Sequence, residues 1–174
     1  MALTYQLISS NALTTSAASI TFSAIPNTYT DLVLKISARS DRNDGAQGQN
    51  MFMGFNGNSS SVYSLTHLRT NGSTVTSGRS SNSTLLSQTY IPMAGIDANT
   101  FNNNEYYFPN YTLSANKVIS GFAAVENNAA TVEFLSITAN LFGVTAAISS
   151  IELTLPSGNF VSGSSFFLYG ISKS

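Results

Sequence analysis

The feature that most constrains this chain is the alternation of apolar and polar residues along many short segments. In the segment 18–22, for example, Ala18, Ile20 and Phe22 alternate with Ser19 and Thr21. A period of two is typical of a β-strand with one buried face, and α-helical periodicity is nearly absent from the chain. The pattern predicts strands at 4–8, 18–22, 31–38, 51–55, 61–68, 84–91, 105–112, 118–126, 131–142, 148–155 and 164–171.

Clusters of Gly, Asn, Ser and Asp separate these segments, and they predict turns and loops at 41–50, 56–60, 71–82, 99–104, 127–128 and 157–159. About ten short strands without helices between them favour an all-β fold, an antiparallel β-sandwich or barrel. Among these we predict a jelly roll of about eight to ten strands. The length of 174 residues fits a single domain over 1–174, in which 1–10 forms either an edge strand or an arm that reaches a neighbour.

Charge is scarce in this chain. Charged residues make up 9% of it and the net charge is −1, whereas an average soluble domain has about 25% charged residues. Seven scattered Lys and Arg residues do not form the basic stripe that phosphate contacts require, so we expect no nucleic-acid partner. For the same reason we expect no membrane partner. Proteins of low net charge repel one another weakly, which favours association.

The chain begins without the charged start and continuous apolar run of a secretory signal, and no apolar run approaches the length of a membrane span. It has no cysteine, which excludes disulfides, thiol chemistry and cysteine-ligated metals. We therefore expect a protein that is made and folded in a cytosol.

Several predicted strands are apolar on both faces. In the segment 166–171, Phe166 and Leu168 face one side, and Phe167, Tyr169 and Ile171 face the other. A sandwich strand buries one face in its own core, so the second apolar face needs another cover. Loops or the N-terminal arm could supply it, but weak charge repulsion favours a subunit interface. We predict a homo-oligomer.

The sequence contains few of the residue combinations that are typical of active sites. His67 is the one histidine, and no Gly-x-Ser-x-Gly elbow accompanies it, so we interpret it as a hydrogen-bonded strand histidine. A glycosidase would need a carboxylate pair; Glu133 is the carboxylate whose partners would decide this, and Glu152 is interpreted as a solvated charge. We predict that the protein is not an enzyme and has no cofactor and no metal ion.

The segment 39–45 concentrates charge in one polar loop and supplies three candidate contact residues, Arg39, Asp41 and Arg42. We expect a surface loop held by Asp–Arg contacts. Calcium binding and an intersubunit contact are the alternatives, although the acidic residue that completes an EF-hand loop is missing.

The segment 97–111 is rich in Asn and aromatic residues, a mixture that binding loops favour. Its candidate interface or ligand contacts are Phe101, Tyr106, Tyr107, Phe108 and Tyr111. Protein–protein contact, ordinary core packing and binding of a ligand such as a sugar are the three alternatives here.

The two ends of the chain resemble small accessory virion proteins of tailed bacteriophages. The opening segments that carry the resemblance are 5–8, 19–26, 29–34 and 38–42, and the closing ones are 151–155, 158–164 and 168–171. They cover about half of the chain, and the middle resembles no family. These are framework motifs, which imply a fold and a setting but no active site. The resemblance implies a jelly-roll protein, commonly a homotrimer, on the particle exterior.

From this resemblance we expect a non-enzymatic capsid decoration (cement) protein that stabilises the lattice of the major capsid protein. It would be made in the host cytoplasm and located in the virion. The alternative is a tail or fibre-tip protein that binds a host surface glycan through the segment 101–111. Head fibres are a further member of the same class of virion proteins.

Overall fold

A computed structural model describes residues 4–127 and 134–172. In these ranges the chain forms twelve β-strands, in chain order β1 (Tyr5–Ala12), β2 (Ser19–Phe22), β3 (Asp31–Ser37), β4 (Gly48–Phe55), β5 (Tyr63–Thr70), β6 (Val75–Ser83), β7 (Leu86–Pro92), β8 (Asn103–Phe108), β9 (Lys117–Val125), β10 (Phe134–Phe142), β11 (Ile151–Thr154) and β12 (Ser165–Ile171). Within the described ranges, no helix has the length and apolar composition needed to cross a lipid bilayer.

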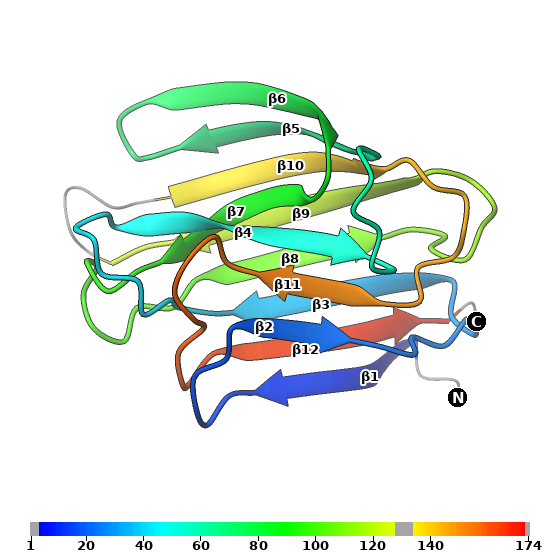
Figure 1. Ribbon diagram of the computed structural model, residues 1–174, viewed down its shortest axis with the longest axis horizontal. Helices are drawn as coiled ribbons and strands as arrows, with labels where there is room; N and C mark the ends of the chain where they lie inside the picture. The colour runs from blue at the N-terminus through cyan, green and yellow to red at the C-terminus, as the bar shows by residue number, and fades with distance from the viewer. Residues whose placement is uncertain (1–3, 128–133, 173–174) are drawn as a thin grey trace.

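The strands form two antiparallel sheets that pack face to face (Figure 1). The larger sheet has eight strands in the order β1-β12-β3-β8-β9-β10-β5-β6, and the smaller has four in the order β2-β11-β4-β7. Every pairing between neighbouring strands is antiparallel. The prediction of an all-β antiparallel sandwich is therefore confirmed.

The core lies between the two sheets and follows from the alternation in the sequence. In β12, buried and half-buried residues alternate along the whole strand, and Phe166 and Leu168 are fully buried. Their neighbours Leu34 and Ile36 on β3 are buried at the matching register positions. Near the other end of the core, the ring of Phe55 packs edge-on against Phe108, with centroids 5.9 Å apart. Such interdigitation of inward-facing side chains is what holds a sandwich together.

The larger sheet extends beyond the smaller one. β9, β10, β5 and β6 continue it past β8, while the smaller sheet ends at β7. The hairpin of β5 and β6 lies at the top of the view in Figure 1, past the edge of the smaller sheet. We call β10, β5 and β6 the overhang. The smaller sheet covers the inner side of the overhang only in part: β7 packs against β10 and β5, whereas β6 lies beyond it, and this leaves a groove.

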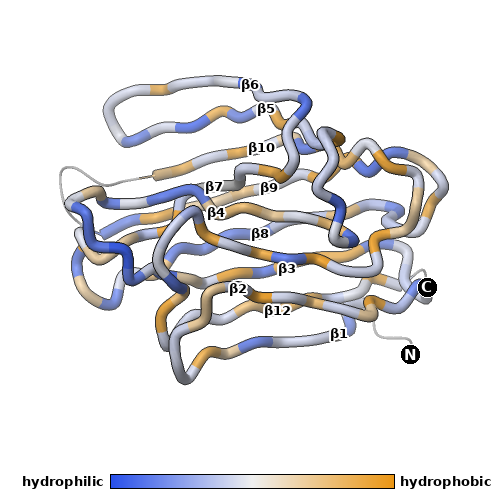
Figure 2. Tube along the Cα trace, viewed as in Figure 1, coloured by the Kyte–Doolittle hydropathy of each residue, from blue (hydrophilic) through white to orange (hydrophobic). Residues whose placement is uncertain are grey.

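Strand β6 corrects the sequence-based prediction, because the segment 71–82 was expected to be a loop. The segment is rich in Ser and Asn, and its residues are exposed or half-buried throughout β6. Figure 2 shows the strand as largely intermediate in hydropathy, unlike the strands of the core. An edge strand that buries neither face carries no hydrophobic alternation, so its backbone pairing with β5 left no signal in the sequence.

The N-terminal segment forms an edge strand. β1 pairs with β12 at the edge of the larger sheet and lies in the plane of the sheet, so it does not cover the side of the sheet that points away from the core.

The strand expected at 105–112 is shorter in the structure. It ends at Phe108, because Asn110 adopts a left-handed conformation (φ 49°) in the turn that follows. Glu133 lies outside the described residues, and Glu152 is exposed on β11, as expected for a solvated charge.

Candidate functional site

The outer face of the larger sheet, which points away from the core, carries most of the exposed large apolar residues. Two rows of paired residues cross it. One row runs Tyr169, Val33, Tyr107, Ser120, Ala139 and Thr66, and the other runs Phe167, Lys35, Glu105, Phe122, Ile137 and Leu68. Phe122 is 43% exposed, Ile137 53% and Leu68 46%. We call this surface the outer face.

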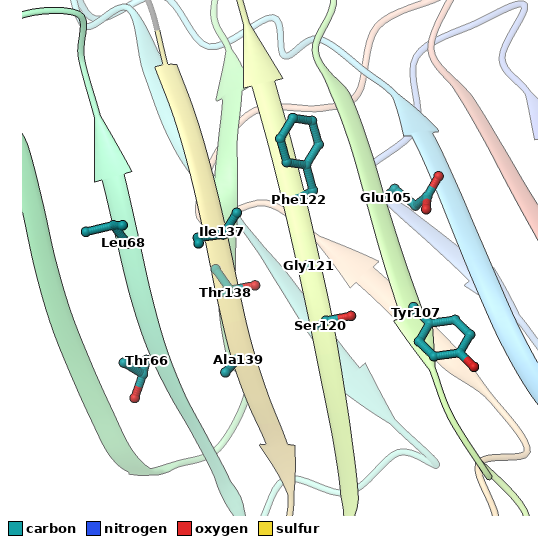
Figure 3. A pocket seen from close by; sticks show the side chains of 10 residues that line it. All are labelled: Thr66, Leu68, Glu105, Tyr107, Ser120, Gly121, Phe122, Ile137, Thr138 and Ala139. Atoms are coloured by element: carbon teal, nitrogen blue, oxygen red, sulfur yellow. The ribbon is translucent and has the colours of Figure 1, made fainter.

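A hollow of about 530 Å³ lies on the outer face over β8, β9, β10 and β5 (Figure 3). Its floor is formed where the small side chains Ser120 and Ala139 pair across β9 and β10. The larger side chains of Tyr107, Phe122 and Leu68 stand around it, as Figure 3 shows. The hollow therefore results from small residues in one row beside large residues in the next. It is shallow and mostly apolar, which fits a protruding apolar side chain of a partner.

The outer face is nearly neutral. Lys35 and Glu105, which pair across β3 and β8, form an ion pair with 2.8 Å between Nζ and Oε2. The hydrogen bond and charge of Glu105 raise the pKa of Lys35. The hydroxyl of Tyr107 donates to Asp31 at 2.8 Å, and this hydrogen bond raises the pKa of Tyr107. These pairs leave no strong charge of one sign between the apolar rows.

Three of the five candidate contact residues in the segment 97–111 belong to the core. Tyr106, Phe108 and Tyr111 are fully buried, so in this fold the alternative of core packing applies to these three residues, and they offer no contact surface. Burial raises the pKa of Tyr111, whose hydroxyl donates to the carbonyl of Pro26. Tyr107 alternates with its buried neighbours, is 37% exposed and belongs to the outer face.

Phe101 and Arg39 lie in a scaffold of loops at the end of the larger sheet. The guanidinium of Arg39 is buried and donates to the carbonyl oxygens of Ile96 (2.8 Å), Asp97 (2.9 Å) and Thr100 (3.1 Å). Burial lowers the pKa of Arg39. The half-buried ring of Phe101 lies close to Gly163, where a Cβ atom would come within 3.2 Å of it. Both candidate residues therefore have structural roles: Arg39 holds the loop 96–101 by hydrogen bonds, and Phe101 packs at the end of that loop.

Asp41 and Arg42 also hold loops together. The carboxylate of Asp41 accepts hydrogen bonds from the amide (2.7 Å) and side chain (3.1 Å) of Asn159 in the loop before β12. Arg42 forms an ion pair with Asp44 and donates to Gln49 at 3.1 Å. The expected Asp–Arg contact is therefore present between Arg42 and Asp44, whereas Asp41 has a different partner. Among the described residues, no three His, Cys, Asp or Glu side chains are grouped as a metal site would require.

A second candidate site, which the sequence did not reveal, lies on the inner side of the overhang. A groove of about 210 Å³ runs between β10 and β5 on one side and β4 and β7 on the other. Its lining is Asn50, Leu65, His67, Arg69, Arg79, Ser80, Ser87, Phe134, Ser136 and Thr138. The alternation along β5 places His67 and Arg69 on the same face as Leu65, but only the short smaller sheet leaves that face open. We call this site the inner groove.

His67 is a strand residue, as expected, but its imidazole forms no hydrogen bond in the described part of the chain, which corrects that part of the interpretation. The ring lies over Gly78 of β6, where a Cβ atom would approach its Cε1 to 2.7 Å. Burial lowers the pKa of His67, and the neighbouring charge of Arg69 lowers it further.

Comparison with known proteins gives no family. No model of a protein family matches the chain, and no curated protein matches it in sequence.

Proposed function

We propose, first, that the sandwich is a jelly roll with two insertions. The support is a long antiparallel ribbon in which β1 pairs with β12, β2 with β11, β3 with β8 and β4 with β7. Successive strands of each arm alternate between the two sheets, so the ribbon winds around the core. That winding is the defining feature of an eight-stranded jelly roll. β5–β6 and β9–β10 are then the insertions, and they build the extension of the larger sheet.

We propose that this jelly roll is a non-enzymatic structural protein of a tailed-phage virion, a capsid decoration protein on the particle exterior. The observation that carries the assembly function is the outer face, where Phe122, Ile137 and Leu68 are between 43% and 53% exposed beside a hollow. A contiguous exposed apolar surface marks an interaction site. The phage setting rests on the resemblance at the two ends of the chain.

The occupant of the outer face is a second copy of this chain, within a homotrimer. The ion pair of Lys35 and Glu105 neutralises the charges between the apolar rows, so two copies can approach without repulsion. The net charge of −1 for the whole chain has the same consequence. A trimer that contacts several subunits of the major capsid protein would then oppose their separation through multivalent burial of surface.

The alternative function, binding of a host glycan through the segment 101–111, has weaker support. Three of its five proposed contact residues, Tyr106, Phe108 and Tyr111, are buried. Tyr107 lies on the outer face and Phe101 in the loop scaffold, so these two do not form one binding surface. We therefore favour assembly over recognition for this segment.

The experiment that tests the outer face is a mass measurement in solution by light scattering. We expect the wild-type chain to be a trimer and Ile137→Gln to be a monomer, because the substitution places an amide in the apolar interface. Leu113→Gln is the matched control: Leu113 is 57% exposed in the loop after β8, against 53% for Ile137 on the outer face. The control should remain a trimer. A monomeric wild-type protein, or equal effects of the two substitutions, would contradict the proposal.

The proposed location in the phage virion is tested by the copy number of the protein per particle. Quantitative mass spectrometry of purified virions gives this number relative to the major capsid protein. A ratio near one supports a decoration protein on the shell. A few copies per particle would favour the tail or a head fibre, and absence from the virion would reject the phage assignment.

A further inference from the structure

The inner groove holds a concentration of hydrogen-bond donors on a sheet face that is mostly apolar. One cross-strand row of the larger sheet runs Leu168, Leu34, Tyr106, Gly121, Thr138, His67 and Gly78. The row is mainly apolar from Leu168 to Gly121 and becomes polar at Thr138 and His67, where it reaches the groove. The next row carries Arg69 beside Ser136. The change in chemistry therefore coincides with the open groove.

The groove is positive and contains no acidic side chain among its lining residues. The Nε of Arg69 donates to Thr76 at 3.1 Å, which orients the guanidinium, and the other guanidinium nitrogens have no partner in the described ranges. Arg79 borders the groove as well. Its cross-strand neighbour on β5 is Thr66, a residue of the outer face. An uncompensated guanidinium next to an imidazole is suited to an oxyanion, which accepts hydrogen bonds from both.

A buried hydroxyl supplies a second, independent observation. Ser136 is 3% exposed, and its Oγ has no hydrogen-bond partner in the structure. It lines the groove next to Arg69 and Phe134. The neighbouring Thr138, by contrast, already accepts a hydrogen bond from Asn140 at 2.9 Å. A buried hydroxyl without a partner is destabilising by itself, and a ligand bound in the groove would supply the partner that the protein does not.

We propose that the inner groove binds the carboxylate of an acidic monosaccharide. Arg69 and His67 hold the carboxylate, and the hydroxyls of Ser136, Ser87 and Ser80 contact the sugar hydroxyls. The aromatic ring of Phe134, which stacks on Tyr90 with 4.4 Å between centroids, adds an apolar surface to the lining of the groove. The volume of about 210 Å³ limits the ligand to a single small unit.

This inference goes beyond the assembly function and does not rest on it, because the inner groove and the outer face lie on opposite sides of the same sheet. Loss of the trimer would leave the groove intact, and loss of sugar binding would leave the trimer intact. The two proposals can therefore fail separately.

The test is an NMR titration of the full chain with D-glucuronate, with D-glucose as the neutral analogue and inorganic phosphate as the simple anion. The chain has one histidine, so the imidazole resonances report on the groove alone. We expect saturable shifts of the His67 resonances with glucuronate and none with glucose. Phosphate should bind more weakly than glucuronate, because it uses the charge but not the hydroxyl lining.

Three variants sharpen the test. Arg69→Gln should weaken glucuronate binding by at least about tenfold, since a charge-assisted hydrogen bond is lost. Ser136→Ala should weaken it without loss of stability, because no protein hydrogen bond is removed. Lys35→Gln is the control for charge: it removes one positive charge from the outer face and should leave binding unchanged. Equal shifts with glucose, no shift with glucuronate, phosphate binding as tight as glucuronate, or an equal effect of Lys35→Gln would each overturn the proposal.

Discussion

At the scale of single residues, Lys117 and Tyr63 are buried polar side chains that specific partners hold. The Nζ of Lys117, which is 2% exposed, donates to the carbonyl oxygens of Leu113 (2.7 Å) and Thr145 (3.2 Å). The hydroxyl of Tyr63 donates to the carbonyl of Asn58 at 3.0 Å and accepts from the amide of Phe55 at 3.0 Å. Each of these groups ties a loop to a strand, so their removal should act on stability.

Tyr63→Phe should lower the free energy of unfolding by about 1–3 kcal/mol, because the buried amide of Phe55 and the carbonyl of Asn58 lose their partner. Urea denaturation followed by circular dichroism measures this change. Tyr5→Phe is the control, since Tyr5 is 50% exposed and the loss of its hydroxyl leaves no buried group without a partner, and we expect a change within about 0.5 kcal/mol. Similar losses in both variants would show that the buried hydrogen bonds of Tyr63 do not stabilise the fold.

His67 should make stability depend on pH. Burial and the charge of Arg69 lower its pKa in the folded state, so as the pH falls below about 6.5 the unfolded chain takes up a proton first. Stability should therefore decrease from pH 7.5 to pH 5 more steeply in the wild type than in His67→Gln. Thermal melts of both proteins across this range provide the measurement. Identical pH profiles would mean that the imidazole titrates alike in the folded and unfolded states.

At the scale of elements, β6 is the strand with the weakest attachment to the rest of the fold. It pairs with β5 alone, and its residues are exposed or half-buried throughout. β3, by contrast, lies between β12 and β8 and buries Leu32, Val33 and Leu34. Local opening of β6 needs no disruption of the core, whereas opening of β3 does.

Amide hydrogens of β6 should accordingly exchange with solvent faster than those of β3, β8 and β12. Native-state exchange followed by NMR measures the difference, with Ile137→Gln as the sample so that association through the outer face does not add protection. Equal protection of β6 and β3 would indicate that the overhang unfolds together with the core.

At the scale of the whole molecule, assembly depends on apolar and uncharged contacts. Charged residues make up 9% of the chain, and the described residues contain two ion pairs, both partly exposed. Subunit association through the outer face therefore has few charges for salt to screen.

The association constant of the oligomer should not weaken between low salt and about 1 M salt, where the Debye length falls to about 3 Å. Sedimentation equilibrium at the two salt concentrations measures it. A steep loss of association at high salt would show that ion pairs hold the subunits together, against the role given to the apolar outer face.

The sequence by itself determined the fold class, because the alternation of apolar and polar residues specifies which face of each strand is buried. It also indicated that β12 has a second apolar face. Eleven of the twelve strands overlap segments predicted from that alternation, and β6 escaped because an edge strand that buries neither face needs no pattern.

The tertiary structure alone decided which residues form a surface. Tyr106 and Tyr107 are neighbours of one chemical type, yet the pairing of β8 buries the first and exposes the second. The inner groove exists because the smaller sheet ends at β7 while the larger sheet continues to β6. Alternation specifies the face of a strand, but strand order specifies what covers that face, and strand order depends on contacts between segments far apart in the chain.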